Sequence, residues 1–112
     1  SNAIRFDVSF TDPTLTSWMI KAIHVSELRV RINGRRAAAG LGPAAWTDPD
    51  LVTQPAVMKA VHITELREAL DGVYVARGMT RPAYTDGALV PGATIIKAAH
   101  ILDLRAAVVA LE

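Results

Sequence analysis

The chain has 112 residues, of which 51% are hydrophobic and 21% charged, and its formal net charge is +1. These values exclude a disordered tail, and they provide no electric field that would hold nucleic acid or an acidic membrane surface. The absence of cysteine excludes disulfides, thiol nucleophiles and thiolate metal sites. Nineteen alanines against two each of Trp, Tyr and Phe favour an all-α fold over a β-sandwich.

Residues 1–3 read Ser-Asn-Ala, which is typical of the remnant of a cleaved expression tag, and they are excluded from the fold. Residues 4–112 are predicted to form a single domain. Neither a signal peptide nor an apolar run of about 18 residues is present, so we expect no insertion into a membrane. We expect the chain to be a piece of a longer protein whose targeting signals lie upstream.

The chain repeats one pattern three times with a spacing of 38 residues: residues 20–29 read IKAIHVSELR, residues 58–67 MKAVHITELR and residues 96–105 IKAAHILDLR. Each block follows a turn-like element made of an aromatic residue, Thr-Asp, Pro or Gly, and Leu. The aromatic residues of these elements are Phe10, Trp46 and Tyr84. The sequence therefore divides into three units, at about 10–45, 46–83 and 84–112.

Helices are predicted near residues 17–39, 55–77 and 93–111, because these segments are rich in helix formers and contain almost no proline. The first two are expected to end at Gly40 and Gly78, each in a left-handed conformation. Gly34 and Gly72 are expected to be tolerated inside the helices. Each Thr-Asp-Pro element is expected to form one short turn of helix with Pro at its first position.

An apolar stripe runs along each predicted helix at the helical period. The stripes consist of Val25, Leu28 and Ile32, then Ile63, Leu66 and Leu70, then Ile101, Leu104 and Val108. No unit can bury its stripe alone, so we predict three loop-helix units that pack as a small three-helix bundle or a short α-solenoid. Loops of about 15 residues allow parallel or antiparallel neighbours.

One arginine and one aspartate recur in each unit, and the arginine flanks the stripe on the side opposite to the histidine. The arginines are Arg29, Arg67 and Arg105, and the aspartates of the turns are Asp12, Asp48 and Asp86. We predict that each guanidinium binds the carboxylate of a turn in its own or a neighbouring unit, with the aromatic residues as anchors. The alternative is three ordinary solvated arginines.

A histidine and an acid recur three positions apart, as His24 with Glu27, His62 with Glu65 and His100 with Asp103. Convergence of the three imidazoles would create a metal site, but each helix supplies only one histidine and one acid. The preferred interpretation is a half-buried imidazole bonded to the backbone or to its neighbouring acid. We therefore predict no metal, no cofactor and no catalytic residue, and sequence motifs for nucleotide, calcium or acyl-transfer sites are absent.

Two weaker features remain. Four arginines near the end of the first predicted helix could bind phosphate or an acidic partner, although cations are favourable at a helix C-terminus anyway: Arg29, Arg31, Arg35 and Arg36. Trp18 and Tyr74 lie outside the recurring pattern and could stack on sugars, although packing in the core or a loop is preferred.

The string IKAxHIxELR, preceded by an aromatic residue and TDPxL, resembles a tandem repeat in the C-terminal tails of large bacterial secreted or surface proteins. The resemblance covers nearly all of residues 10–112 and implies an exported or surface-located parent chain. It implies an accessory module with no established activity. The third unit departs from the pattern, with Gly87 in place of Pro and Asp103 in place of Glu.

The sequence therefore predicts a non-catalytic interaction or attachment module at the end of an exported protein. The expected partners are a protein or a cell-surface glycan, in addition to the upstream domains of the parent chain. The alternative is a purely structural C-terminal cap of an upstream repeat domain, and a histidine-based metal-binding module is a third possibility.

Overall fold

The computed structural model describes residues 10–12, 20–50, 58–94 and 96–112. Within these ranges the chain forms three helices and no strand: α1 (Ala22–Ala38), α2 (Ala60–Ala76) and α3 (Ala98–Val109). Each helix packs against both others, and the radius of gyration is 13.6 Å, close to that of a compact domain of this length. The predicted all-α class is confirmed.

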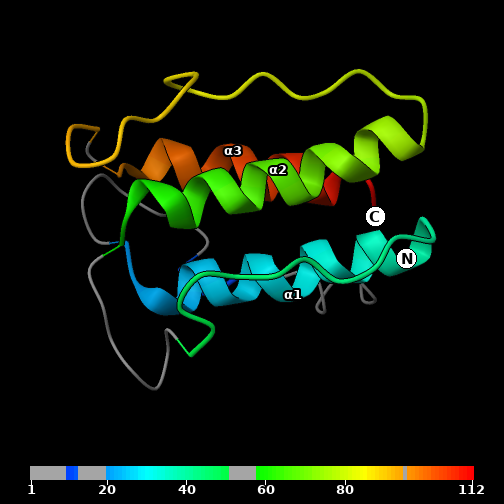
Figure 1. The fold of residues 1–112 in the computed structure, drawn as a ribbon, viewed down its shortest axis with the longest axis horizontal. Helices are drawn as coiled ribbons and strands as arrows, with labels where there is room; N and C mark the ends of the chain where they lie inside the picture. The colour runs from blue at the N-terminus through cyan, green and yellow to red at the C-terminus, as the bar shows by residue number, and fades with distance from the viewer. Residues whose placement is uncertain (1–9, 13–19, 51–57, 95) are drawn as a thin grey trace.

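The three helices run parallel to one another, as their colour gradients in Figure 1 show. The described part of each connection runs back along the bundle to the end where the helices begin. The segment after α2 makes this return over nearly the whole length of the molecule (Figure 1). The long loops of the sequence are therefore needed for the topology, because parallel neighbours cannot be joined by a tight turn.

The helices begin later than predicted. Lys21, Lys59 and Lys97 are the N-cap residues and have extended backbone angles. The predicted starts at 17, 55 and 93 are therefore about five residues too early, although residues 17–19, 55–57 and 95 themselves lie outside the described residues. The physical reason is a cap made by a histidine, a residue that the propensity argument treated as ordinary helix interior.

The helix ends and internal glycines agree with expectation. Gly40 and Gly78 have φ of 80° and 69°, directly after the C-caps of α1 and α2. The next backbone N–H bonds back to the third-last helical carbonyl, 2.8 Å from Leu41 N to Arg36 O and 2.8 Å from Met79 N to Tyr74 O. This is the Schellman arrangement, in which glycine avoids the steric penalty of the left-handed conformation. Gly34 and Gly72 lie inside uninterrupted helix.

The core lies between the three helices, and it contains the predicted stripes. The nine stripe residues are all fully buried: Val25, Leu28, Ile32, Ile63, Leu66, Leu70, Ile101, Leu104 and Val108. Tyr74 is also buried and donates its hydroxyl to Ala107 O at 2.7 Å, so it packs in the core and is no exposed sugar platform. Trp18 lies outside the described residues.

Truncation of a stripe residue should destabilise the bundle. We expect Leu66→Ala to lower the free energy of unfolding by about 2–5 kcal/mol, because it removes buried methyl groups and leaves a cavity. Leu102→Ala is the matched control, since Leu102 is 39% exposed, and it should change the value by less than about 0.5 kcal/mol. Urea denaturation measures both, and equal losses would show that the assigned core face is wrong.

Candidate functional site

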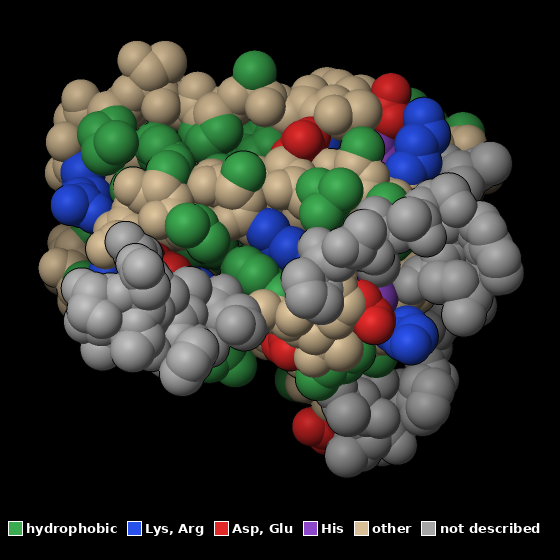
Figure 2. All heavy atoms as spheres, turned by 180° about the vertical axis from the view of Figure 1, so that it is seen from behind, with side chains coloured by type: hydrophobic (Ala, Val, Ile, Leu, Met, Phe, Trp, Pro, Cys, Tyr) green, Lys and Arg blue, Asp and Glu red, His purple; other side chains and the backbone are tan. Residues whose placement is uncertain are grey.

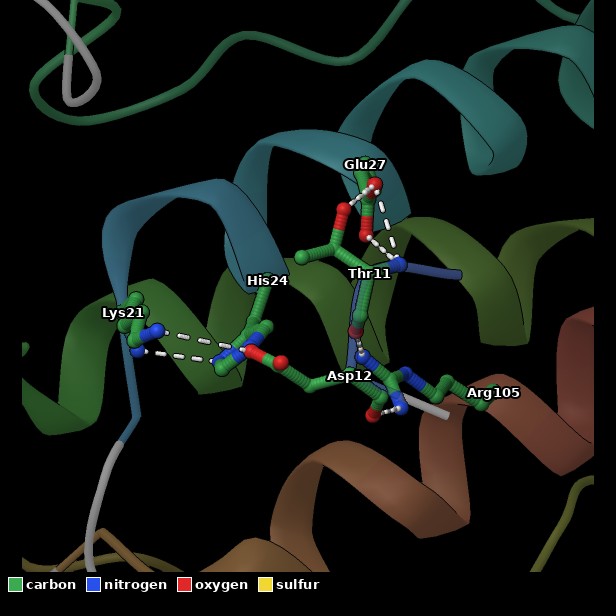
Figure 3. A network of polar contacts seen from close by, with 6 residues as sticks. All are labelled: Thr11, Asp12, Lys21, His24, Glu27 and Arg105. Atoms are coloured by element: carbon green, nitrogen blue, oxygen red, sulfur yellow. Dashed lines mark hydrogen bonds and ion pairs between the residues drawn. The ribbon is translucent and has the colours of Figure 1, made fainter. Parts of the chain in front are cut away.

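The candidate site is a network that recurs once per helix, at the end where the helices begin. Each copy contains the Thr-Asp pair of a turn, the lysine, histidine and Glu or Asp of the helix that holds this turn, and an arginine from another helix. In the first copy, Thr11 and Asp12 lie between side chains of α1 and Arg105 of α3 (Figure 3). All members are residues that the sequence singled out as recurring.

Each histidine caps its own helix and holds a turn. The Nδ1 atom of His24 accepts the backbone N–H of Lys21 at 2.9 Å, and Nε2 lies 2.8 Å from Oδ2 of Asp12. Because Nδ1 accepts a hydrogen bond, Nε2 carries the proton and donates it to the carboxylate. The same pair of bonds occurs at His62 with Asp48 and at His100 with Asp86.

This arrangement changes two predictions about the histidines. The imidazoles are fully buried, where half-burial was predicted. The predicted bond to the backbone is confirmed at Lys21 N. The acidic partner, however, is the aspartate of the turn and not the acid three residues along the same helix, Glu27 in the first unit. The histidine takes the place that Glu or Gln has in an ordinary capping box. Its second ring nitrogen forms an additional hydrogen bond, to the aspartate of the turn.

The acid of each block holds the threonine of the same turn. Glu27 accepts the backbone N–H of Thr11 at 3.0 Å and its hydroxyl at 2.6 Å, and Glu65 binds Thr47 at 2.9 and 2.6 Å. Asp103, with a shorter side chain, accepts the backbone N–H of Thr85 at 2.7 Å. One helix therefore fixes two consecutive residues of its turn through two different side chains.

The aspartates have left-handed backbone angles, with φ of 55° at Asp12, 54° at Asp48 and 55° at Asp86. The prediction of a short helical turn at each Thr-Asp-Pro element is therefore wrong at the described positions, which form bends and tight turns. Aspartate tolerates this conformation better than most residues. The twist turns the carbonyl groups of Thr and Asp away from the helix that holds the turn.

Those carbonyl groups accept an arginine from another helix. Arg29 of α1 donates to Thr47 O at 2.6 Å and Asp48 O at 2.9 Å, in the turn of the second unit. Arg105 of α3 donates to Thr11 O at 2.7 Å and Asp12 O at 2.9 Å, in the turn of the first unit. Because the last unit thus binds the first, the contacts form a closed ring.

The predicted carboxylate partner of the arginines is wrong. The guanidinium groups are buried, 5% exposed at Arg29 and 6% at Arg67 and Arg105, and they bind backbone oxygens, since histidine already occupies the carboxylates. Solvated arginines are excluded by the same numbers. In the third unit Arg67 reaches Thr85 O and Gly87 O, one residue further along, where glycine replaces proline.

The recurring aromatic residues lie against these guanidinium groups. The centroids of the Trp46, Tyr84 and Phe10 rings are 5.3, 4.8 and 4.8 Å from Cζ of Arg29, Arg67 and Arg105. Each ring is partly buried against the core. An aromatic face offers a buried cation electrostatic stabilisation that an aliphatic side chain does not.

The three aspartates of the network all have a lowered pKa. The hydrogen bond from histidine holds the pKa of Asp12, Asp48 and Asp86 below its usual value, and a nearby lysine contributes. Asp12 and Asp86 also pair with Lys21 and Lys97 at 3.6 and 3.1 Å. These exposed pairs lie at the helix-start end, where blue and red side chains are adjacent in Figure 2, and they add little stability.

The histidines show no metal-site arrangement. Both ring nitrogens of each imidazole are engaged within its own unit, and no group of three or more His, Asp or Glu suited to a metal ion occurs within 10–12, 20–50, 58–94 and 96–112. In the same ranges no helix is long and apolar enough to cross a bilayer.

The predicted arginine patch is divided among structural contacts. Arg31 pairs with Glu112 and lies 4.2 Å from the centroid of the Phe10 ring, and Arg36 donates to Gly42 O and Ala69 O. Arg29 belongs to the ring of turns. Arg35 and Arg36 lie in the last turn of α1, which agrees with the preferred explanation of cations at a helix C-terminus. Binding of phosphate or an acidic partner stays a prediction.

Sequence reasoning missed the residues that vary between units beside the aromatic positions. Asp71 accepts the hydroxyl of Tyr84 at 2.8 Å, whereas Asn33 at the equivalent place accepts Ala44 N–H at 2.9 Å. A position-by-position comparison at the spacing of 38 shows this difference, because Asn33 and Asp71 occupy equivalent positions directly before Gly34 and Gly72.

No protein-family model, curated protein or solved structure matches the chain. The function is therefore inferred from the residues and their geometry.

The histidine cap can be tested at the central unit. We expect His62→Ala to lower the free energy of unfolding by about 2–4 kcal/mol, because it leaves a cavity and removes both bonds of the ring. His62→Gln should cost about half as much, since glutamine can still accept the N–H of Lys59. Equal losses in urea denaturation would show that the backbone bond contributes nothing.

Acid should weaken the fold through the aspartates. Their pKa is lowered in the folded chain, so the folded chain binds fewer protons than the unfolded chain near pH 4, and stability rises with pH there. We expect the urea midpoint to be steady above about pH 5 and to fall as pH drops below about 4. Asp48→Asn should flatten this dependence, and an identical profile in the variant would contradict it.

Proposed function

We propose that this chain is a self-contained, non-catalytic interaction module that attaches a larger exported protein to a surface, and that the sequence repeat is also its structural unit. The observation that carries the proposal is the closed ring of turn contacts. The recurring polar side chains bind their own turns and those of neighbouring units, so their hydrogen bonds hold the scaffold together.

A catalytic role is disfavoured by the state of the imidazoles. A general base needs a free ring nitrogen within hydrogen-bond reach of its substrate. In His24, His62 and His100 one nitrogen accepts a backbone N–H and the other donates to an aspartate. Proton transfer at these rings would break a helix cap or release a turn, so the network suits stability better than turnover.

The ring also favours a self-contained module over a structural cap. In a cap that continues an upstream stack of similar units, the turn of the first unit would receive its arginine from the preceding unit. Here Arg105 fills that position, at 2.7 Å from Thr11 O. The module thus has no described turn left open for a preceding unit of the same kind.

The surface offers places for a partner. A groove of about 470 Å³ lies between the start of α2 and the loop before α3, lined by residues 58–61 and 91–94. Several apolar side chains are exposed, including Val30 at 74%, Val75 at 54% and Val90 at 54%. A groove between units is what an attachment module needs, and the resemblance to tails of bacterial secreted or surface proteins supports an exported parent.

The attachment function is tested by binding. Fluorescently labelled protein should bind saturably to an immobilised glycan array or to intact bacterial cells, and an excess of unlabelled protein should displace it. The chain with Leu66→Asp places a charge in the core and is the unfolded control for adsorption. Signal that does not saturate, or that the unfolded chain reproduces, would refute attachment and leave the structural cap.

Ring closure is tested by Arg105→Lys. Lysine cannot donate to two carbonyl oxygens in the fixed geometry of a guanidinium, so we expect a loss of about 1–3 kcal/mol of unfolding free energy. Arg81→Lys, at an exposed loop position, is the control and should be neutral. If both variants unfold at the same urea concentration as the original chain, the third unit does not depend on the first.

A further inference from the structure

One pocket combines an aromatic ring with polar side chains whose hydrogen-bonding groups the scaffold uses only in part. It has a volume of about 200 Å³ and lies between α1 and the turn of the second unit, lined by Ser26, Arg29, Val30, Asn33, Trp46 and Pro49. This volume is below the roughly 300–1,000 Å³ of pockets for drug-sized ligands, so it suits one small ring.

The hydrogen-bonding capacity of this pocket is unfilled. Asn33 uses Oδ1 to accept Ala44 N–H, and its Nδ2 has no partner among the described residues. The indole N–H of Trp46 and the hydroxyl of Ser26 also lack partners there. Arg29 is 95% buried and its Nε has no partner, but this holds for the equivalent arginines of the other two units as well, so it does not distinguish the pocket. Because the side chains of Asn33, Trp46 and Ser26 are only half-buried, water reaches their polar groups, and a ligand that displaces this water can form the same hydrogen bonds.

The equivalent position of the second unit is closed by its own residues. Tyr84 replaces Trp46 and Asp71 replaces Asn33, and the two bind each other at 2.8 Å. Burial raises the pKa of Tyr84, and its bond to Asp71 adds to this, so the phenol stays a donor. Tyr84 and Asp71 therefore pair with each other, whereas Trp46 and Asn33 at the equivalent positions of the first copy do not.

The equivalent position of the third unit is covered. Phe10 lies between Arg105 and Arg31, 4.8 and 4.2 Å from its centroid, and Arg31 is held there by Glu112. Leu102 and Val109 stand where Ser26 and Asn33 stand in the first unit, so polar side chains are absent at those two places. Among the described residues, the first copy therefore has a pocket beside polar groups that no neighbouring side chain fills.

We propose that this pocket binds one pyranose ring of a saccharide, which stacks on Trp46 and forms hydrogen bonds with Asn33 and Ser26. The lining contains no carboxylate, and its one cation already donates to two carbonyls, so a neutral ligand fits better than an ion. A pyranose offers an apolar face for Trp46 and Val30 and hydroxyl groups at its rim. This inference rests on the proposed attachment function and names its ligand class.

The test is a titration of the full chain with the methyl glycosides of glucose, galactose, mannose and N-acetylglucosamine, followed by NMR. At least one should shift the amides of Ser26, Val30 and Asn33 and the indole of Trp46 saturably, with a Kd near 1 mM, as expected for a ligand of this size. Fluorescence of a Trp18→Phe variant, with Trp46 as the one remaining tryptophan, gives an independent readout.

The matched variant transplants the closed pair of the second unit into the first, as Trp46→Tyr with Asn33→Asp. It should keep its melting temperature, because the same pair already exists in the fold, and its affinity for the glycoside should fall at least tenfold. Equal affinity in the variant, shifts at other residues, or no shifts with any glycoside would overturn the inference. Chemical-shift changes at these residues with added peptides but with no glycoside would also overturn the inference.

The outcome also separates this inference from the attachment function. If labelled protein binds cells or the glycan array and the double variant binds equally well, the pocket is not the site and attachment stands. If neither the glycosides nor the array and cells give saturable binding, both proposals fail.

Discussion

A buried guanidinium between one helix and the next turn is the contact on which this fold depends. Three such groups take the carbonyl oxygens of Thr and Asp from a neighbouring unit and lie against an aromatic ring of that unit. Burial lowers the pKa of Arg29, Arg67 and Arg105, because removing a charge from water is unfavourable. That cost is offset only when the turn is in place.

The histidines and acids make this contact possible. The left-handed aspartate would be an unfavourable conformation for a free loop, and it persists because His24 holds its carboxylate and Glu27 holds the preceding threonine. Two side chains of one helix therefore hold the turn in this conformation, and an arginine of another helix donates hydrogen bonds to the carbonyl groups that the turn presents. Cooperation of this kind couples the three units, since no turn is complete without a neighbour.

The three units differ at positions around a recurring frame, which consists of the Thr-Asp turn, the histidine, the acid and the arginine. The frame residues are repeated almost without change, whereas Asn33 and Asp71 differ, as do Trp46 and Tyr84. Because the frame contacts occur three times, a residue beside them can change without removing any of these contacts. Such a position is therefore available for binding a ligand. The proposed saccharide pocket lies at such a position, and so does the closed pair that serves as its control.

Much of the fold was accessible from the sequence because it depends on local periodicity. The nine stripe residues, the helix-ending glycines Gly40 and Gly78, and the recurring polar residues were all found by spacing and residue type. The predicted bond of each histidine to the backbone is right, but the carboxylate partners of the arginines and histidines were predicted wrongly. A carboxylate is the expected partner of arginine, and nothing local shows that histidine has taken it.

The sequence alone determined which polar and apolar residues recur and that three helices form. Only the tertiary structure decided that the helices run parallel, that Arg105 closes a ring on Thr11 and Asp12, and that Trp46 borders a pocket. These outcomes depend on contacts between residues far apart in the chain, and local propensity does not encode such contacts.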